Sequence, residues 1–131
     1  AVFYEEDWNK AFAACDTTTS FIHMTLRSDV DRRVLSDEVY YPVFAKKQHL
    51  PHPEISCKIR KKDGAYELTL KSKQLARDVF VEIPVQGVRF SDNFFDLLPG
   101  VPKKILVTSA DGTPLEDISV SLHQLSDIVS F

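Results

Sequence analysis

The chain has 131 residues, of which 44% are hydrophobic and 11% aromatic, including nine Phe. This apolar content is enough for a packed core, so the composition excludes a disordered segment and fits one compact domain, or a small domain with part of a neighbour. The formal net charge of -3 provides no overall positive field, and no apolar run approaches the ~20 residues of a membrane-spanning helix. We therefore expect neither nucleic acid nor a membrane as a partner.

A short helix is predicted near the N-terminus, over residues 6–14. Trp8, Phe12 and Cys15 fall at spacings that place them on one face of such a helix. Trp8 is the one tryptophan of the chain, and two roles are open for it. It can stack on a sugar ring as a carbohydrate-binding residue, or it can anchor this segment in a core, which we favour because a large aromatic side chain contributes most there.

Two strands are predicted to follow. In residues 20–27, Ile22, Met24 and Leu26 alternate with polar residues, which is the pattern of a strand buried on one face. Residues 34–43 are the second strand, and Pro42 places it at an edge or near a strand end because proline donates no hydrogen bond. Two strands make an incomplete sheet, so residues 1–43 are expected to be the tail of another domain. Their unpaired edge must pack on the rest of the chain or pair with another chain.

Residues 44–53 predict a linker and the best domain boundary. Pro51 and Pro53 push the preceding residues toward extended backbone and stop any regular element. His49 and His52, taken with Cys57, match no established zinc spacing. We therefore expect linker histidines exposed to water and no metal ion.

Residues 54–131 carry enough short strands for a complete β module. The alternation of Ile55, Cys57 and Ile59 on an inward face, the turn dipeptide Asp63-Gly64 and a second alternating run predict a β-hairpin. Short strands at this spacing indicate an all-β sandwich. Its further strands are predicted at residues 78–83, 88–90, 94–98, 104–109 and 118–123.

Basic residues gather on the first strand of this hairpin, at Lys58, Arg60, Lys61 and Lys62. Because Ile59 interrupts the cluster and the turn ends it, we interpret it as the solvated face of a hairpin and not as a binding patch.

The two cysteines, Cys15 and Cys57, are able to form one disulfide or to remain free thiols. The inward position of Cys57 among apolar residues favours free thiols, because a buried thiol behaves as a small hydrophobic group.

The chain has several neighbouring carboxylates, and glycosidases use a pair of carboxylates for catalysis. Adjacent residues on a strand point to opposite faces, so we predict that the chain contains no catalytic residue. It also lacks a serine elbow and a glycine-rich phosphate loop, and we expect no cofactor. The acidic neighbours are Glu5, Glu6, Asp7, Glu116 and Asp117.

Two stretches carry a resemblance to a known family. The first is Val34-Leu35-Ser36-Asp37-Glu38-Val39-Tyr40-Tyr41, followed by Leu50-Pro51-His52-Pro53. The second is Phe90-Ser91-Asp92-Asn93-Phe94-Phe95-Asp96-Leu97-Leu98-Pro99-Gly100, followed by Lys104-Ile105-Leu106-Val107. They resemble, respectively, the end of the penultimate Ig-like domain and the signature of the terminal Ig-like domain in β-mannosidases of the family-two glycoside hydrolase clan.

The resemblance implies the C-terminal part of a preceding Ig-like domain in residues 1–43, a Pro-rich linker in 44–53 and a terminal Ig-like β-sandwich in 54–131. Such enzymes carry their catalytic glutamates on a (β/α)8 barrel of about 250 residues, which this chain is too short to contain. The implied function is a non-catalytic accessory region that braces the barrel or shapes substrate access. A glycan-degrading parent would be periplasmic, secreted or lysosomal sooner than cytoplasmic.

Two other functions stay open. One is a carbohydrate-binding module that holds glycan through exposed aromatic residues such as Trp8, Tyr40 or Tyr41. The other is an unrelated Ig-like interaction domain, because sandwiches serve many functions. The order Cys, Trp, Cys of antibody domains is absent, since Trp8 precedes both cysteines.

Residues 91–100 are predicted to be a fold signature and not a reaction centre. Ser91, Asp92 and Asn93 favour turns held by side-chain hydrogen bonds to the backbone, and Pro99-Gly100 supplies the next turn. A calcium site would draw on Asp92, Asn93 and Asp96, but the glycine and distal glutamate of a calcium hand are missing, which favours the turn. The apolar members are expected to fill a core: Phe94, Phe95, Leu97 and Leu98.

Overall fold

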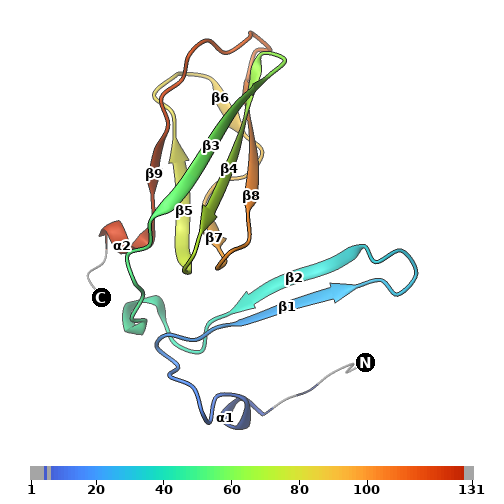
Figure 1. Cartoon of the computed structure of the whole chain (residues 1–131), viewed down its shortest axis with the longest axis vertical. Coiled ribbons are helices and arrows are strands. Elements are labelled where there is room, and N and C mark those ends of the chain that lie inside the picture. Colours follow the sequence, from blue (N-terminus) through green and yellow to red (C-terminus); the bar gives the residue numbers. More distant parts are fainter. Residues whose placement is uncertain (1–4, 6, 129–131) are drawn as a thin grey trace. The chain divides into compact units, whose positions relative to one another are not determined.

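The computed structural model describes residues 5 and 7–128, apart from the side chains of Trp8 and Ile128. Strands dominate these residues, which confirms the predicted all-β class (Figure 1). The chain forms two compact units, one ending at His49 and the other beginning at Leu50. Neither helix of the described residues has the length and the apolar character needed to cross a membrane.

The first unit contains one hairpin and two short helical turns. Its elements are α1 (Trp8–Ala11), β1 (Ile22–Arg27), β2 (Val34–Tyr40) and the 3-10 turn η1 (Ala45–Lys47). The helix is shorter than the predicted 6–14, and η1 lies in the segment predicted to be an irregular linker. β1 and β2 pair antiparallel and form a two-stranded sheet, with a bulge between Leu26 and Arg27.

The two faces of this hairpin differ in chemistry. On one face Asp37 Oδ1 lies 2.7 Å from His23 Nε2 and accepts a 2.7 Å hydrogen bond from Thr25 Oγ1. The hydrogen bond from Thr25 and, to a smaller extent, the one with His23 hold the pKa of the Asp37 carboxyl below its usual value. The other face carries Met24 and Leu26.

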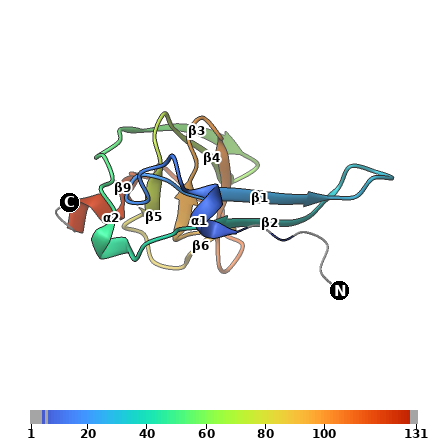
Figure 2. The ribbon, with the colours of Figure 1, turned by 90° about the horizontal axis from the view of Figure 1, so that it is seen from below.

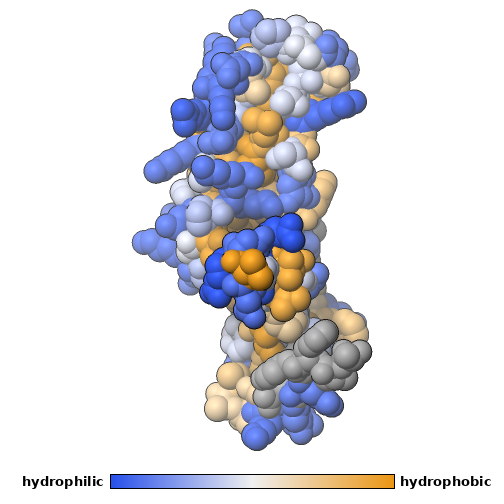
Figure 3. All heavy atoms as spheres, turned by 90° about the vertical axis from the view of Figure 1, so that its right-hand side faces the viewer, coloured by the Kyte–Doolittle hydropathy of each residue, from blue (hydrophilic) through white to orange (hydrophobic). Residues whose placement is uncertain are grey.

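The prediction that Met24 and Leu26 lie on a buried face is wrong, because both are exposed. A two-stranded sheet has no second layer to cover an apolar row, and the register places polar Glu38 and Ser36 opposite the two residues. In Figure 3 the hairpin points toward the viewer, and hydrophobic spheres lie among hydrophilic ones on its surface. The alternation therefore identifies the strand correctly but not its burial.

The second unit is a sandwich of two antiparallel sheets. The larger sheet has the order β3-β4-β8-β6 and the smaller one the order β7-β5-β9 (Figures 1 and 2). The helical turn α2 follows β9 and was not predicted. The elements are β3 (Ile55–Lys62), β4 (Ala65–Ser72), β5 (Ala76–Glu82), β6 (Val88–Phe90), β7 (Phe95–Leu97), β8 (Lys103–Ser109), β9 (Ser121–His123) and α2 (Leu125–Ile128).

The core lies between these two sheets. β4 shows why, since every second residue from Tyr66 to Ser72 is buried. Removal of this apolar surface from water is the main driving force of folding. Core residues come from both sheets, from the position just after β5 and from the loop before β9: Tyr66, Leu68, Leu70, Ala76, Val79, Val81, Ile83, Leu97, Ile105, Val107 and Leu115.

The predicted hairpin of β3 and β4 is present, with Asp63 and Gly64 at its turn. Both have positive φ, 49° and 78°, as a tight hairpin turn requires. Ile59 lies on the inward face as predicted, because it pairs with the core residue Leu68, but its side chain is half exposed. β3 is one of the two edge strands of a four-stranded sheet, and the facing sheet has only three strands with which to cover that sheet.

Candidate functional site

The signature segment, residues 91–100, crosses from the larger sheet to the smaller one. It begins after β6, contains β7 and ends before β8. Ser91 extends the pairing of β6 with β8, because its N–H donates to Leu106 O and its Oγ accepts from Leu106 N, both at 2.9 Å. At the far end, Gly100 N donates to Ser72 O at 2.8 Å, which connects the segment to β4.

The side-chain amide of Asn93 makes hydrogen bonds to β5 like those of a neighbouring strand. Its Oδ1 accepts from Val81 N at 2.8 Å and its Nδ2 donates to Val81 O at 3.0 Å. The same Oδ1 accepts from Phe94 N at 3.1 Å. One amide side chain therefore satisfies both backbone groups of Val81, whose own side chain is in the core.

The carboxylates of the segment also bind backbone groups. Asp92 Oδ1 accepts from Asn93 N at 2.8 Å, and its Oδ2 lies 2.6 Å from Lys103 Nζ. Asp96 Oδ1 accepts from Asp78 N at 3.0 Å, beside the irregularity in β5. In the part of the chain that the structure describes, no three potential ligands are close enough together to hold a metal ion.

Phe94 corrects the prediction that the four apolar residues of the segment fill a core. Leu97 is buried and Phe95 and Leu98 are partly buried, but Phe94 is 70% exposed. Its φ of 57° lies in the left-handed region, which an aromatic residue rarely adopts. This reversal of the backbone, held by Asn93, turns the Phe94 side chain outward and allows Phe95 to pack against the core.

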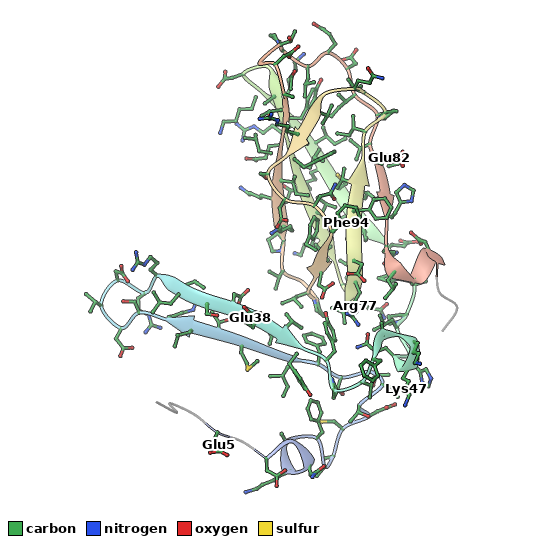
Figure 4. The ribbon with its side chains drawn as sticks, turned by 180° about the vertical axis from the view of Figure 1, so that it is seen from behind. Glu5, Glu38, Lys47, Arg77, Glu82 and Phe94 are labelled. Atoms are coloured by element: carbon green, nitrogen blue, oxygen red, sulfur yellow. The ribbon has the colours of Figure 1, made fainter. Side chains whose placement is uncertain are left out.

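Three rings form a stack across the outer face of the smaller sheet, which we call the aromatic row. The Phe80 ring lies 5.1 Å from Phe94 and 4.6 Å from His123, with interplanar angles of 20° and 19°. His123 Nε2 lies 3.1 Å from Glu82 Oε2, and Figure 4 shows Phe94 and Glu82 at this sheet. Because one face of Phe94 meets Phe80 while most of its surface stays exposed, the other face is open to solvent.

Sequence reasoning missed this row. Its members come from β5, β9 and the turn before β7, and only the sheet register aligns Phe80 with His123. Aromatic sites were instead predicted at Trp8, Tyr40 and Tyr41, all in the first unit. The side chain of Trp8 lies outside the described residues, so its sugar-stacking role stays a prediction.

The remaining predicted residues do not form a common site. Glu116 and Asp117 are exposed, as are Glu5 and Asp7, whereas Glu6 lies outside the described residues. The acidic neighbours also belong to two different units.

The histidines and cysteines are also dispersed. His49 belongs to the first unit, where its Nδ1 lies 3.3 Å from Thr18 Oγ1. His52 belongs to the second unit, where its Nε2 lies 3.4 Å from Asp127 Oδ1. Both histidines are exposed, as predicted. Cys15 and Cys57 are free thiols, and burial raises the pKa of the Cys57 thiol.

Residues 50–128 match the family model Ig_mannosidase, described as an Ig-fold domain. This range includes every strand of the second unit and the whole signature segment. No curated protein matches the chain.

Proposed function

Because the chain belongs to the Ig_mannosidase family of Ig-fold domains, we propose that it is a non-catalytic accessory region of a β-mannosidase-like glycoside hydrolase. There it would brace the catalytic barrel or shape the approach to the substrate pocket. The match over residues 50–128 is the observation that carries this proposal. The remainder of the parent chain is the partner that it implies.

The contacts of the signature segment support a scaffold role. Asn93 and Asp96 direct their oxygens to backbone N–H groups of β5, and Ser91 binds the backbone of β8. Side chains held in this way stabilise the crossing between the two sheets.

We also propose that residues 1–43 are the C-terminal part of a preceding Ig-like domain, that 44–53 link it to the terminal domain and that 54–131 form that domain. The exposed row of Met24 and Leu26 supports this proposal, because a two-stranded sheet is marginal in water without a second layer. A facing sheet from the rest of the parent would bury the row. Self-association through this incomplete N-terminal sheet is the alternative.

The catalytic part of the proposal is tested by assaying the purified chain with aryl β-mannosides. We expect no release of the aryl group above the rate of a heat-unfolded sample, because the reacting glutamates would lie on the barrel. Hydrolysis that persists after repurification, and that Glu116→Gln or Asp117→Asn abolishes, would contradict the proposal.

The aromatic row favours carbohydrate binding as a second candidate function. The free face of Phe94 offers a flat apolar surface to the C–H groups of a sugar ring, and the nearby pair His123 and Glu82 offers hydrogen-bonding partners for hydroxyl groups. A backbone strained at an exposed aromatic residue is itself a reason to expect a function there.

For this candidate we expect Phe94→Ser to weaken binding of manno-oligosaccharides by about tenfold, the loss of one aromatic stacking contact. Titration calorimetry measures the affinity. The matched control is Phe44→Ser, since Phe44 is 76% exposed but lies in the first unit. Equal affinities of the two variants would contradict the proposal that the aromatic row binds glycan.

A further inference from the structure

Positive charge concentrates on the outer face of the larger sheet. Six cationic residues alternate with core residues along its four strands, and all six are exposed. Glu67 is the one carboxylate on these strands, which the structure describes in full. The chain as a whole has a formal net charge of -3, so this face has the opposite sign. We call it the basic face: Lys58, Arg60 and Lys62 of β3, Lys71 of β4, Arg89 of β6 and Lys104 of β8.

The register shows that these six residues share one side of the sheet. Lys58 and Lys104 both pair with Thr69, from the two sides of β4. Arg60 pairs with Glu67, and Arg89 pairs with Thr108. The residues between them, such as Leu68, Ile105 and Val107, point into the core.

The charge of the basic face is not neutralised within the molecule. Among the described residues, none of the six cations makes an ion pair, although Glu67 lies across from Arg60. Successive cations on β3 are about 7 Å apart, and Lys58 and Lys104 are about 10 Å apart, from the usual strand dimensions. These spacings lie within or near the screening length at physiological salt, so the cations repel one another. A bound anion would relieve that repulsion.

Protection of a sheet edge explains only part of the basic face. Lysines on an edge strand discourage pairing with other chains, and β3 and β6 are the edge strands. Lys71 and Lys104, however, lie on the two inner strands β4 and β8, whose edges are already paired. The basic face therefore carries more positive charge than protection of its two edge strands requires.

The sequence alone favours a solvated face for the cluster on β3, but the register places the cations of β4, β6 and β8 beside it. We therefore propose that the basic face binds a linear anionic polysaccharide, one that carries carboxylate or sulfate groups on successive sugars. Cations at every second residue of β3 present a repeating charge, which suits a ligand with a repeating charge of opposite sign. A single-stranded nucleic acid would need aromatic side chains for base stacking, and the outward-facing residues of these four described strands include none. The proposal does not depend on the accessory role in a glycosidase.

The test is titration calorimetry of the whole chain with three glycans: a heparin oligosaccharide, an oligogalacturonate and a neutral manno-oligosaccharide. We expect both anionic glycans to bind, with an affinity that falls as the salt rises from about 50 to 200 mM. The neutral glycan should show no salt-dependent binding. Absence of binding by both anionic glycans at the lower salt would overturn the proposal, as would tighter binding of an oligothymidylate at equal salt.

A pair of charge-reversal variants locates the site. Lys58→Glu with Arg60→Glu should weaken binding of the heparin oligosaccharide by about tenfold or more, because the local field is reversed. Lys46→Glu with Lys47→Glu changes the net charge equally but leaves all six cations of the basic face in place, and it should change the affinity by less than about twofold. All four positions are exposed, so both variants should keep their thermal unfolding midpoint within a few degrees. An equal loss of affinity in both would mean that net charge alone attracts the glycan.

Discussion

Replacement of Leu68 by alanine should lower the free energy of unfolding by about 3 kcal/mol. Leu68 is fully buried, at 0% exposure, in the middle of β4. It pairs with Ile59 on one side and Ile105 on the other, within a core that both sheets line. Removal of three methyl(ene) groups there leaves a cavity that the neighbouring strands cannot fill without breaking their hydrogen-bond ladders. Urea unfolding followed by circular dichroism measures the loss.

The matched control is Leu106→Ala. Leu106 lies next to Ile105 in β8 of the same sheet, but it points to the outer side and is 43% exposed. We expect this variant to lose about 1 kcal/mol, because nearly half of the Leu106 surface stays in water and its removal leaves no closed cavity. Similar losses at both positions would mean that the two faces of the larger sheet are wrongly assigned.

The second large effect is expected at Asn93. Substitution by alanine should lower the free energy of unfolding by about 3 kcal/mol, since Val81 N and Val81 O each lose a hydrogen-bond partner beside the core. Hydrogen exchange of the Val81 amide should become faster in the same variant, which ties the loss to this contact. Both quantities are measured on the intact chain.

Asp92→Ala is the control for Asn93. Asp92 precedes Asn93 in the same turn, and its ion pair with Lys103 is partly exposed. Exposed ion pairs contribute about 0 to 1 kcal/mol, and the Asn93 N–H that Asp92 also binds is exposed to water, so this variant should lose clearly less stability than Asn93→Ala. If Asp92→Ala destabilised the chain as much as Asn93→Ala, the turn as a whole, and not the clamp on Val81, would be the stabilising feature.

Local signals in the sequence predict much of the second unit. The dipeptide Asp63-Gly64 fixes a hairpin turn because both residues tolerate positive φ, and the alternation on either side fixes the two strands. A strand was predicted around residues 88–90, and the structure has β6 there. Boundaries are less exact at β9, which is shorter than the predicted 118–123, because its pairing depends on β5, a strand far away in the sequence.

Burial was harder to predict than secondary structure. Alternation marks the apolar side of a strand, but whether that side is covered depends on a second layer. The hairpin carrying Met24 has no such layer in its own unit, and Ile59 lies on an edge strand. The predicted burial of Phe94 is wrong for another reason, since its positive φ reverses the side to which an apolar residue would otherwise point.

The candidate sites depend on contacts between distant segments. The sequence shows the basic cluster on β3, but Lys71, Arg89 and Lys104 join it only through the register of the larger sheet. In the same way, Phe80, Phe94 and His123 become neighbours only when β5 pairs with β9 and with β7. Neither surface corresponds to a short linear motif from which it could be predicted.

The pairing of two antiparallel sheets is tested most directly by nuclear Overhauser contacts between backbone protons in solution. We predict cross-strand contacts between Leu68 and Ile105 in the larger sheet and between Phe80 and His123 in the smaller one. Amides of β4, which is paired on both sides, should exchange most slowly. Sequential helical contacts across residues 55–109, or the absence of either cross-strand pair, would contradict the Ig-like sandwich and the accessory function inferred from it.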